Sequence, residues 1–251
     1  MKVNNSPITH IIFDLDGLLL NTVPIYDEMM RTIVVRHGHS YSDALRASLR
    51  GRNRRDCAEM IVRHCAGCLT VDECLNQLTK QHARKLPNCQ LMPGAERLIW
   101  HLHRHGYPMA IGTSSSVQSV ALKTKGHEEL FGLMHHVICG TDNRVGNGKP
   151  APDIFLVTAG AFGDPVPEPS QCLVFEDALN GVKAARAADM QAVYVADPLD
   201  VPTLEEDSTA FIEENAEIWK KRWRSGVLVI DSLLNFKPEL FGLPPFESDS
   251  Y

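Results

Sequence analysis

The sequence has no long hydrophobic run and no excess of basic residues. No apolar stretch approaches the roughly 20 residues that a helix needs to cross a bilayer, and the polar start, from Met1 to Ser6, has no signal-peptide core. The formal net charge is −6 at pH 7, whereas binding to nucleic-acid phosphates usually requires a basic face. We therefore expect neither a membrane nor a nucleic acid as partner, and we expect a cytosolic protein.

A disulfide framework is not expected either. The seven cysteines are an odd number in a chain without a secretory signal, so free thiols are expected. The stretch His64-Cys65-Ala66-Gly67-Cys68 could hold zinc with Cys57 or Cys74, but it lacks a second ligand pair at finger-like spacing. We interpret these residues as buried helix cysteines rather than as metal or redox groups.

The composition is otherwise that of a soluble globular protein, with 44% hydrophobic and 22% charged residues in 251. This length allows one large domain or a core with a smaller insertion. Apolar residues at helical spacing predict four helices in the first third of the chain, over residues 25–37, 42–49, 54–65 and 70–86. Breaks at Pro87-Asn88 and Met92-Pro93-Gly94 end this all-helical block.

Short apolar runs on both sides of the helical block predict buried strands. They lie at residues 8–13, 109–112, 137–139, 173–175 and 192–195, with helices between them near 98–102 and over 117–132. This alternation predicts an α/β fold with a doubly wound parallel sheet, in which a cap domain of residues 21–92 is inserted into a core of residues 1–20 and 93–251. Later segments predict a helix over 208–224 and an edge strand over 227–230.

Polar residues that could perform chemistry follow the predicted strands. Asp14 and Asp16 follow the first strand, Thr113 the second, Lys149 lies in the loop after the third, and Glu176 and Asp177 follow the fourth. Parallel strands end at one edge of the sheet, where ligands collect in α/β proteins, so we expect these groups to converge. A lone Asp-x-Asp could merely cap a turn, and Glu176 could cap the next helix. Their common edge favours an active site.

Several carboxylates in one crevice repel one another, by on the order of 4 kcal/mol per close pair at an effective dielectric of about 20. A divalent cation would neutralise them, and ligation by oxygen alone points to Mg²⁺. Lys149 and the Thr113 hydroxyl could then bind a phosphoryl group. The serines at 114–116 are more consistent with capping the next helix, although the Ser114 amide could also contact phosphate.

Four motifs at these strand ends resemble those of the haloacid dehalogenase superfamily of phosphohydrolases. They are Phe13-Asp14-Leu15-Asp16-Gly17, Ile111-Gly112-Thr113-Ser114, Gly148-Lys149-Pro150-Ala151-Pro152-Asp153 and Phe175-Glu176-Asp177-Ala178. The resemblance covers nearly the whole chain and includes a helical cap inserted after the first motif. It implies a phosphatase with a Rossmannoid core that forms an aspartyl-phosphate intermediate.

The resemblance also implies a role for each motif residue. Asp14 would be the nucleophile, and Asp16 the acid that protonates the leaving oxygen and then activates water. Mg²⁺ would be held by Asp14, the backbone carbonyl of Asp16 and Asp177, with assistance from Glu176. The phosphate ligands would be Thr113, Ser114 and Lys149. Independently of the family, a carboxylate that attacks phosphorus beside a metal and a lysine is sound covalent catalysis.

Shorter stretches are similar to the pseudouridine-5'-phosphatase group and its plant relatives that act on glycerol phosphate. These stretches are Asp16–Leu20, Leu122–His127, Leu133–Val137 and Phe236–Pro244. Asn21 stands where such relatives usually have Asp, and Val23 where many have Glu. Both lie at the cap hinge, so the departures concern the choice of substrate more than the core chemistry. Residues around 205–224 look like an insertion to which we assign no function.

Individual residues separate several reactions within the superfamily. A halide-displacing dehalogenase needs neither the second aspartate nor a metal, so Asp16 together with Asp177 argues against it. A phosphonate-cleaving enzyme would need a cap lysine for a Schiff base, and no lysine lies between Lys2 and Lys80. A sugar phosphomutase shares the core and stays open, since the difference is whether the cap excludes water. A binding module on a retained fold is disfavoured, because no motif residue is lost.

The predicted function is Mg²⁺-dependent hydrolysis of a small phosphorylated metabolite by a monomeric enzyme. The leading substrate is pseudouridine 5'-phosphate on resemblance, and glycerol phosphate or another sugar phosphate is the alternative. Specificity is expected in the cap, where Arg52, Asn53 and Arg54 form a polar loop that could bind a base or a polyol by hydrogen bonds. The competing interpretation is that these arginines are solvent-exposed and do not contact the substrate.

Overall fold

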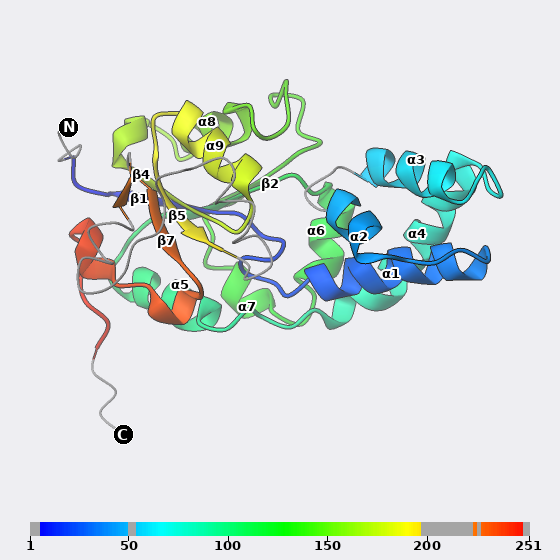
Figure 1. Ribbon diagram of the computed structural model, residues 1–251. Helices are drawn as coiled ribbons and strands as arrows, with labels where there is room; N and C mark the ends of the chain where they lie inside the picture. The colour runs from blue at the N-terminus through cyan, green and yellow to red at the C-terminus, as the bar shows by residue number, and fades with distance from the viewer. Residues whose placement is uncertain (1–5, 50–53, 197–222, 225–226, 248–251) are drawn as a thin grey trace.

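The structure is a computed structural model of the 251-residue chain, and it describes residues 6–49, 54–196, 223–224 and 227–247. A sheet with helices on its two faces forms one part of the molecule, and a group of helices that lies to one side of this sheet forms the other (Figure 1). The predicted α/β class is confirmed.

The sheet has the strand order β3-β2-β1-β4-β5-β7-β6, and all neighbouring pairs are parallel except β7 and β6. The strands are β1 (His10–Phe13), β2 (Met109–Thr113), β3 (His136–Cys139), β4 (Cys172–Glu176), β5 (Gln191–Val195), β6 (Trp223–Arg224) and β7 (Val227–Ile230). β1 is therefore an inner strand with β2 and β4 on its two sides, which explains its continuous apolar run.

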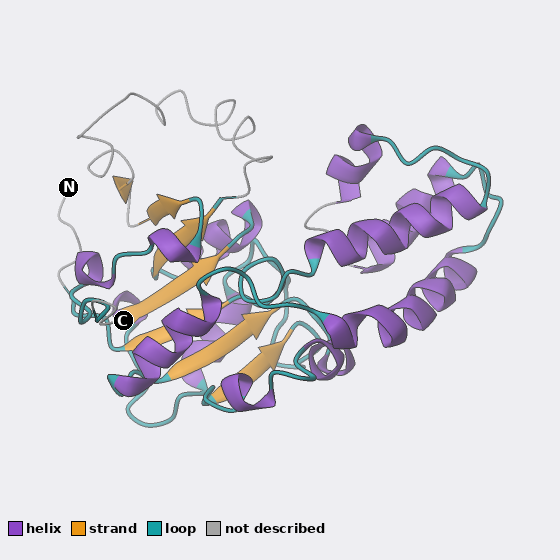
Figure 2. Ribbon diagram, turned by 90° about the horizontal axis from the view of Figure 1, so that it is seen from below, coloured by secondary structure: helices purple, strands orange, loops and turns teal. Residues whose placement is uncertain are grey.

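Helices cover both faces of the sheet, as Figure 2 shows. α8 (Asp153–Gly160) and α9 (Leu179–Ala187) pack on one face, while α5 (Ala95–Arg104) and α7 (Glu128–Phe131) lie on the other. Side chains of a strand alternate between faces, so Ile11 and Phe13 join the cluster with α5, and Ile12 joins the cluster with α8 and α9. This packing fixes β1 from both sides.

The helices inserted after β1 form a hydrophobic cluster of their own, which includes Met29, Ile61 and Leu78. They are α1 (Val23–Arg36), α2 (Asp43–Leu49), α3 (Arg54–His64) and α4 (Val71–Lys85), followed by the short η1 (Leu86–Asn88). Local signals fix their starts, with Pro24 in the first turn of α1 and a Thr70–Glu73 capping box at α4. These four helices lie within one or two residues of the predicted ranges. We refer to them as the cap.

The structure corrects three predicted elements. The helix predicted over 117–132 is two helices, α6 (Val117–Lys123) and α7, because the chain turns at Gly126 with a φ of +88°. The strand at 227–230 is not an edge strand, since β7 pairs with both β5 and β6. Residues 223–224, predicted as the end of a helix, form β6. The rest of that predicted helix, 208–222, lies outside the described residues.

Within the described residues, no helix is long and apolar enough to cross a membrane. All seven cysteines are free thiols, as predicted, and six of them are buried, with Cys68 exposed.

Candidate active site

The site begins with Asp14, the residue after β1. Phe13 is in register with Ile111 of β2 and Phe175 of β4, and the Asp14 N–H donates to the Phe175 carbonyl at 3.0 Å. Thr113 and Glu176 are the last residues of β2 and β4. The parallel register therefore brings these three side chains to one edge of the sheet, as the sequence predicts.

Lys149 reaches this edge from the loop after β3. Its Nζ lies 2.5 Å from Asp14 Oδ1 and 2.5 Å from Glu176 Oε1. Burial alone would lower the pKa of Lys149, but the two carboxylates outweigh it and raise that pKa. The lysine is therefore a fixed positive charge against Asp14, whose side chain is only 9% exposed.

Asp14, Glu176 and Asp177 form an acidic cluster in which one oxygen of each lies within 4.8 Å of the others. Burial raises the pKa of Asp177 well above its usual range, and the nearby Glu176 and Asp14 carboxylates raise it further. Burial likewise raises the pKa of Glu176, although Lys149 opposes this. The cluster is thus short of positive charge, and its all-oxygen donor set could hold a hard divalent cation.

Two glycines leave room for this cluster. A Cβ on Gly17, where φ is +83°, would lie 2.1 Å from Asp177 Oδ2. A Cβ on Gly181 in the first turn of α9 would lie 1.7 Å from Glu176 Oε1. Glu176 also accepts the Ala178 N–H at 3.0 Å, so its carboxylate is held between Lys149 and the chain that enters α9.

Asp16 pairs with a different lysine, Lys123. Its Oδ2 accepts hydrogen bonds from Lys123 Nζ at 2.5 Å and Ser115 Oγ at 2.7 Å. Burial acts to raise the pKa of Asp16, but the Lys123 ammonium outweighs it and the pKa is lowered. The two aspartates of the first motif therefore have different partners, with Asp14 against one lysine and Asp16 against another.

Two of the three predicted phosphate ligands lie at the end of β2, with Thr113 as its last residue and Ser114 directly after it. Thr113 is buried and its Oγ1 accepts the Ser115 N–H at 3.2 Å, while Ser114 is exposed. The helix cap predicted among these serines is Ser116, which accepts the Ser119 N–H. Ser115, by contrast, binds Asp16, a contact that the sequence analysis missed.

The model of the haloacid dehalogenase-like hydrolase family matches residues 8–189, which include all four motifs. The chain is a haloacid dehalogenase-like hydrolase. It is 42% identical over 240 residues to a probable pseudouridine-5'-phosphatase of Drosophila melanogaster, covering 95% of this chain and 96% of the relative. It is 39% identical over 246 residues to (DL)-glycerol-3-phosphatase 2 of Arabidopsis thaliana, covering 97% and 95%.

A solved structure of a hydrolase of the same family, from Entamoeba histolytica, shares the fold. The TM-score is 0.69 over 93% of this chain and 97% of that chain, at 21% identity. The predicted family and the predicted enzyme class, a phosphoric monoester hydrolase, are confirmed by these similarities.

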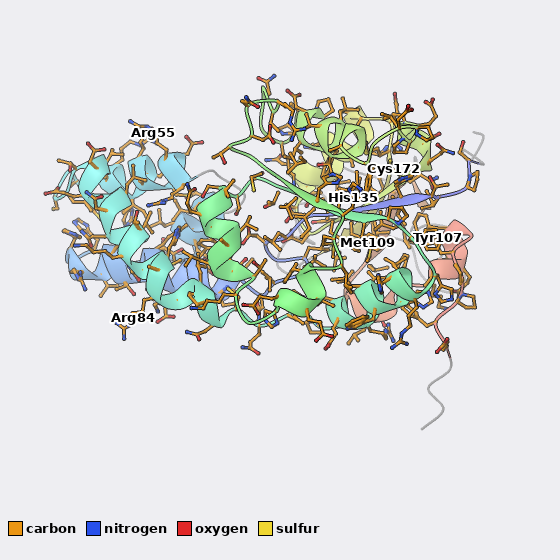
Figure 3. All side chains as sticks on the ribbon, turned by 180° about the vertical axis from the view of Figure 1, so that it is seen from behind. Arg55, Arg84, Tyr107, Met109, His135 and Cys172 are labelled. Atoms are coloured by element: carbon orange, nitrogen blue, oxygen red, sulfur yellow. The ribbon has the colours of Figure 1, made fainter. Side chains whose placement is uncertain are left out.

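The polar cap loop of this hydrolase is only partly described. Arg52 and Asn53 lie outside the described residues. Arg54 is the first residue of α3, and its Nη2 donates to the Leu75 carbonyl at 2.7 Å and to the Thr79 hydroxyl, both on α4. Arg54 thus ties two cap helices together. Other cap arginines, such as Arg55 and Arg84, lie on the outer surface (Figure 3).

Two cap residues near Asp16 were not among the predicted site residues. Tyr26 on α1 and His82 on α4 form an edge-on ring contact with centroids 5.5 Å apart, and the Lys123 ammonium lies 5.9 Å from the Tyr26 ring. Burial lowers the pKa of His82 to about 4, with help from the positive charges of Arg54 and Lys123. A lone histidine in a helix gives no sequence signal for such a position.

Gly181→Ala is expected to lower both stability and activity of this hydrolase. The new methyl group would push the Glu176 carboxylate away from Lys149, at a cost of about 1 to 3 kcal/mol in the free energy of unfolding. Gly160→Ala in α8 is the matched control, because nothing lies within 4 Å of its Cβ position, and it should be neutral or slightly stabilising. Denaturant unfolding and phosphate-ester hydrolysis measure both effects. Equal stability of the two variants would contradict the close contact.

The low pKa of His82 predicts that acid destabilises the fold through this residue. Between pH 6.5 and about 4, His82 is protonated in the unfolded chain but stays neutral in the folded chain. The free energy of unfolding therefore falls as the pH falls. Below pH 4 the total decrease in the free energy of unfolding from His82 is about 3 kcal/mol, at 1.36 kcal/mol per pKa unit. Denaturant unfolding of the parent and of His82→Gln should therefore converge toward low pH, whereas the exposed-site control His103→Gln should follow the parent. Parallel pH profiles for the parent and His82→Gln would refute the prediction.

Proposed function

We propose that this chain is a Mg²⁺-dependent phosphatase that hydrolyses a small phosphomonoester through an aspartyl-phosphate on Asp14. The observation that carries this proposal is the position of the Asp14 carboxylate, at the carboxyl end of an inner parallel strand, where it contacts Lys149 and belongs to the acidic cluster. In such a sheet this is the edge where ligands bind. The family assignment and the phosphatase names of its relatives support the same activity.

Each residue at the site has a chemical task in this proposal. One Asp14 oxygen attacks phosphorus, and the bond from phosphorus to the leaving oxygen breaks as Asp16 supplies a proton to that oxygen. Asp16 then takes a proton from the water that attacks the aspartyl-phosphate. Lys149 and the Thr113 hydroxyl, with the exposed Ser114, bind and neutralise the phosphoryl oxygens.

Mg²⁺ fits the acidic cluster, because the cluster offers only oxygen donors and burial leaves Asp177 short of a counter-charge. The proposed ligands are Asp14, the Asp16 backbone carbonyl and Asp177, with Glu176 assisting. When bound, Mg²⁺ would draw charge from the phosphoryl oxygens and allow the phosphate to approach the carboxylates. Glu176 contributes chiefly by its contact with Lys149, which keeps that lysine beside Asp14.

Pseudouridine 5'-phosphate is the proposed substrate, and glycerol phosphate is the second candidate. The 42% identity to a probable pseudouridine-5'-phosphatase supports the first, and the 39% identity to a glycerol-3-phosphatase supports the second. Another sugar phosphate, or phosphoryl return to a sugar by a phosphomutase, is the remaining alternative within the family. A binding module is less favoured, because Asp14, Lys149 and Asp177 are all retained at the strand ends.

Selection among these esters is assigned to the proposed cap, residues 21–92, over a core of residues 1–20 and 93–251. Arg52 and Asn53 are the proposed polar contacts. Arg54 is better suited to hold α3 on α4, because its guanidinium is already bonded to Leu75 and Thr79. Tyr26 is a further candidate, because its ring lies 5.9 Å from the Lys123 ammonium, which pairs with Asp16. The predicted monomeric state and cytosolic location stay predictions.

Hydrolysis of p-nitrophenyl phosphate with and without Mg²⁺ tests the proposed activity. We expect phosphate release that requires the metal. A screen of phosphorylated metabolites at fixed Mg²⁺, including pseudouridine 5'-phosphate and glycerol 3-phosphate, then tests the substrate. Arg52→Ala should change the ranking of these esters, whereas Arg54→Ala should mainly lower the melting temperature. No phosphate release from any ester would reject the function, and an unchanged ranking in Arg52→Ala would remove that residue as the selector.

A further inference from the structure

α6 carries a lysine that is completely buried. Lys123 has 0% relative exposure, and its Nζ lies 2.5 Å from both Asp16 Oδ2 and Ser115 Oγ. A charged side chain is rarely buried to this extent unless it is paired. The pairing partner here is one of the two aspartates of the first motif, 107 residues earlier in the chain.

The contacts of Lys123 fix the orientation of the Asp16 carboxylate. Oδ2 accepts hydrogen bonds from two donors, Lys123 and Ser115, and these two donors also contact each other. Oδ1 is buried and makes no hydrogen bond of normal geometry among the described residues, and the nearby Thr22 side chain also helps to lower the pKa of Asp16. Oδ2 is therefore held in place, and Oδ1 is the oxygen that can give a proton to a ligand or take one from it.

Lys123 lies where the cap meets the sheet. α6 packs against α4 and η1, and the ammonium lies 5.9 Å from the ring of Tyr26 on α1. Figure 1 shows α6 beside the cap helices rather than beside α8 and α9. The cap and the loop after β2 thus enclose the lysine from two sides, which keeps its side chain in one place.

Lys123 does not repeat the role of Lys149. Lys149 contacts Asp14 and Glu176, and the described hydrogen bonds of Lys123 go to Asp16 and Ser115 instead. Each of the two lysines thus pairs with one aspartate of the first motif, Lys149 with Asp14 and Lys123 with Asp16. A ligand role toward phosphate therefore suits Lys149, whereas the geometry around Lys123 suits the orientation of a neighbouring carboxylate.

We propose that Lys123 is a positioning residue, which with Ser115 holds the Asp16 carboxylate so that its free oxygen faces the leaving oxygen and, later, the attacking water. Lys123 itself keeps its protons throughout. The proton passes from Asp16 to the leaving oxygen as the phosphorus–oxygen bond breaks, and from water to Asp16 as the aspartyl-phosphate is hydrolysed. This inference rests on the proposed phosphatase function.

A double-mutant cycle tests the proposal. Lys123→Met removes the ammonium that contacts Asp16 and Ser115, with little change in volume. The value of kcat for p-nitrophenyl phosphate should then fall roughly 10- to 100-fold, the scale of a misplaced catalytic group. KM should change much less, because Lys123 does not touch the substrate. Asp16→Asn should lose about 10²- to 10⁴-fold, and adding Lys123→Met to it should cause no further loss.

The single-turnover kinetics sharpen the test. p-Nitrophenolate leaves without a proton, so the burst of phenolate that reports phosphorylation of Asp14 should persist in Lys123→Met while the later steady state slows. Lys123→Arg keeps the charge and should recover part of kcat. Lys125→Met is the matched control, because this lysine is exposed two residues further on, and it should retain the parent kcat.

The outcomes separate the inference from the function on which it rests. A parent enzyme that hydrolyses no phosphate ester rejects the proposed function. If the parent is active, the effect of Lys123→Met on kcat is compared in two backgrounds, the parent and Asp16→Asn. An equal loss of kcat in both backgrounds overturns the positioning role. If Lys123→Met does not fold, Ser115→Ala replaces it in the cycle, since it removes one donor from Asp16 Oδ2 and keeps the ion pair. Its smaller loss should likewise vanish in the Asp16→Asn background, and a loss that persists there overturns the role.

Discussion

Replacing Asp14 with asparagine is expected to abolish phosphate-ester turnover while the fold persists. The amide has nearly the same shape but is a poor nucleophile, so kcat should fall by at least about 10⁴-fold, the scale seen when a covalent catalyst is removed. Lys149 would keep its contact with Glu176 at 2.5 Å, which limits the cost of the lost charge. Circular dichroism and phosphate release measure the two halves of this prediction.

Asp142→Asn is the matched control for that experiment. Asp142 pairs with Arg144 at 2.7 Å in the loop after β3, and in the described hydrogen bonds its side chain contacts none of the proposed site residues. It should retain the parent rate. Hydrolysis at the parent rate by Asp14→Asn, once mass spectrometry has excluded deamidation of the introduced amide, would show that the nucleophile is another group.

Removal of divalent metal is the second change with a large expected effect. EDTA should silence the enzyme and Mg²⁺ should restore it, because the crowded carboxylates of Asp14, Glu176 and Asp177 would otherwise repel the phosphate. Ca²⁺ should inhibit, since its larger and looser coordination shell places the phosphoryl group badly for in-line attack. Rates at fixed substrate across these three ions measure the effect.

Metal binding also has a readout that is independent of activity. An ion that binds only the folded chain stabilises it, by about 2.7 kcal/mol at a concentration 100 times the dissociation constant. Mg²⁺ should therefore raise the melting temperature of the parent, and this shift should be lost in Asp177→Asn. Full activity in excess chelator, together with no thermal shift in the parent, would remove the metal from the mechanism.

The sequence predicts which side chains meet at one edge of the sheet, because the signals are local. Each of Asp14, Thr113 and Glu176 follows or ends a short apolar run, and a parallel sheet has a single edge at which such runs end. Lys149 was found through its motif rather than through a strand. The helices of the cap were predicted within two residues for a similar reason, since their apolar spacing and caps lie within each segment.

Contacts between distant segments could not be predicted in this way. Lys123 ends a short helix, where a lysine ordinarily faces water and favours the helix dipole. Its burial depends on how α6 packs against α4, which no local pattern encodes. The sequence likewise predicts a helix cap among the serines at 114–116 and gives no sign that Ser115 contacts Asp16. The stretch Leu122–His127 was similar to a phosphatase group, and that similarity was the one available signal for Lys123.

The order of the sheet shows the same limit. The run at 227–230 was predicted correctly as a strand, but its neighbours are set by pairing with residues elsewhere in the chain. The break in the helix predicted over 117–132 could have been predicted from Gly126, because this residue takes a φ of +88° that favours glycine. Local breakers can be read from the sequence, whereas partners across the fold need the structure.

The separate hydrophobic cluster of the cap has a consequence for how such enzymes diversify. Met29, Ile61 and Leu78 belong to the cap cluster, whereas Ile11 and Phe13 belong to the core cluster that includes α5. Ile25 and Tyr26 pack against both clusters. Substitutions within the cap cluster can therefore change the packing of the cap helices without disturbing the packing of β1. Under the proposed function, related enzymes can change substrate through the cap and keep the same chemistry, provided that Ile25 and Tyr26 still pack against both clusters.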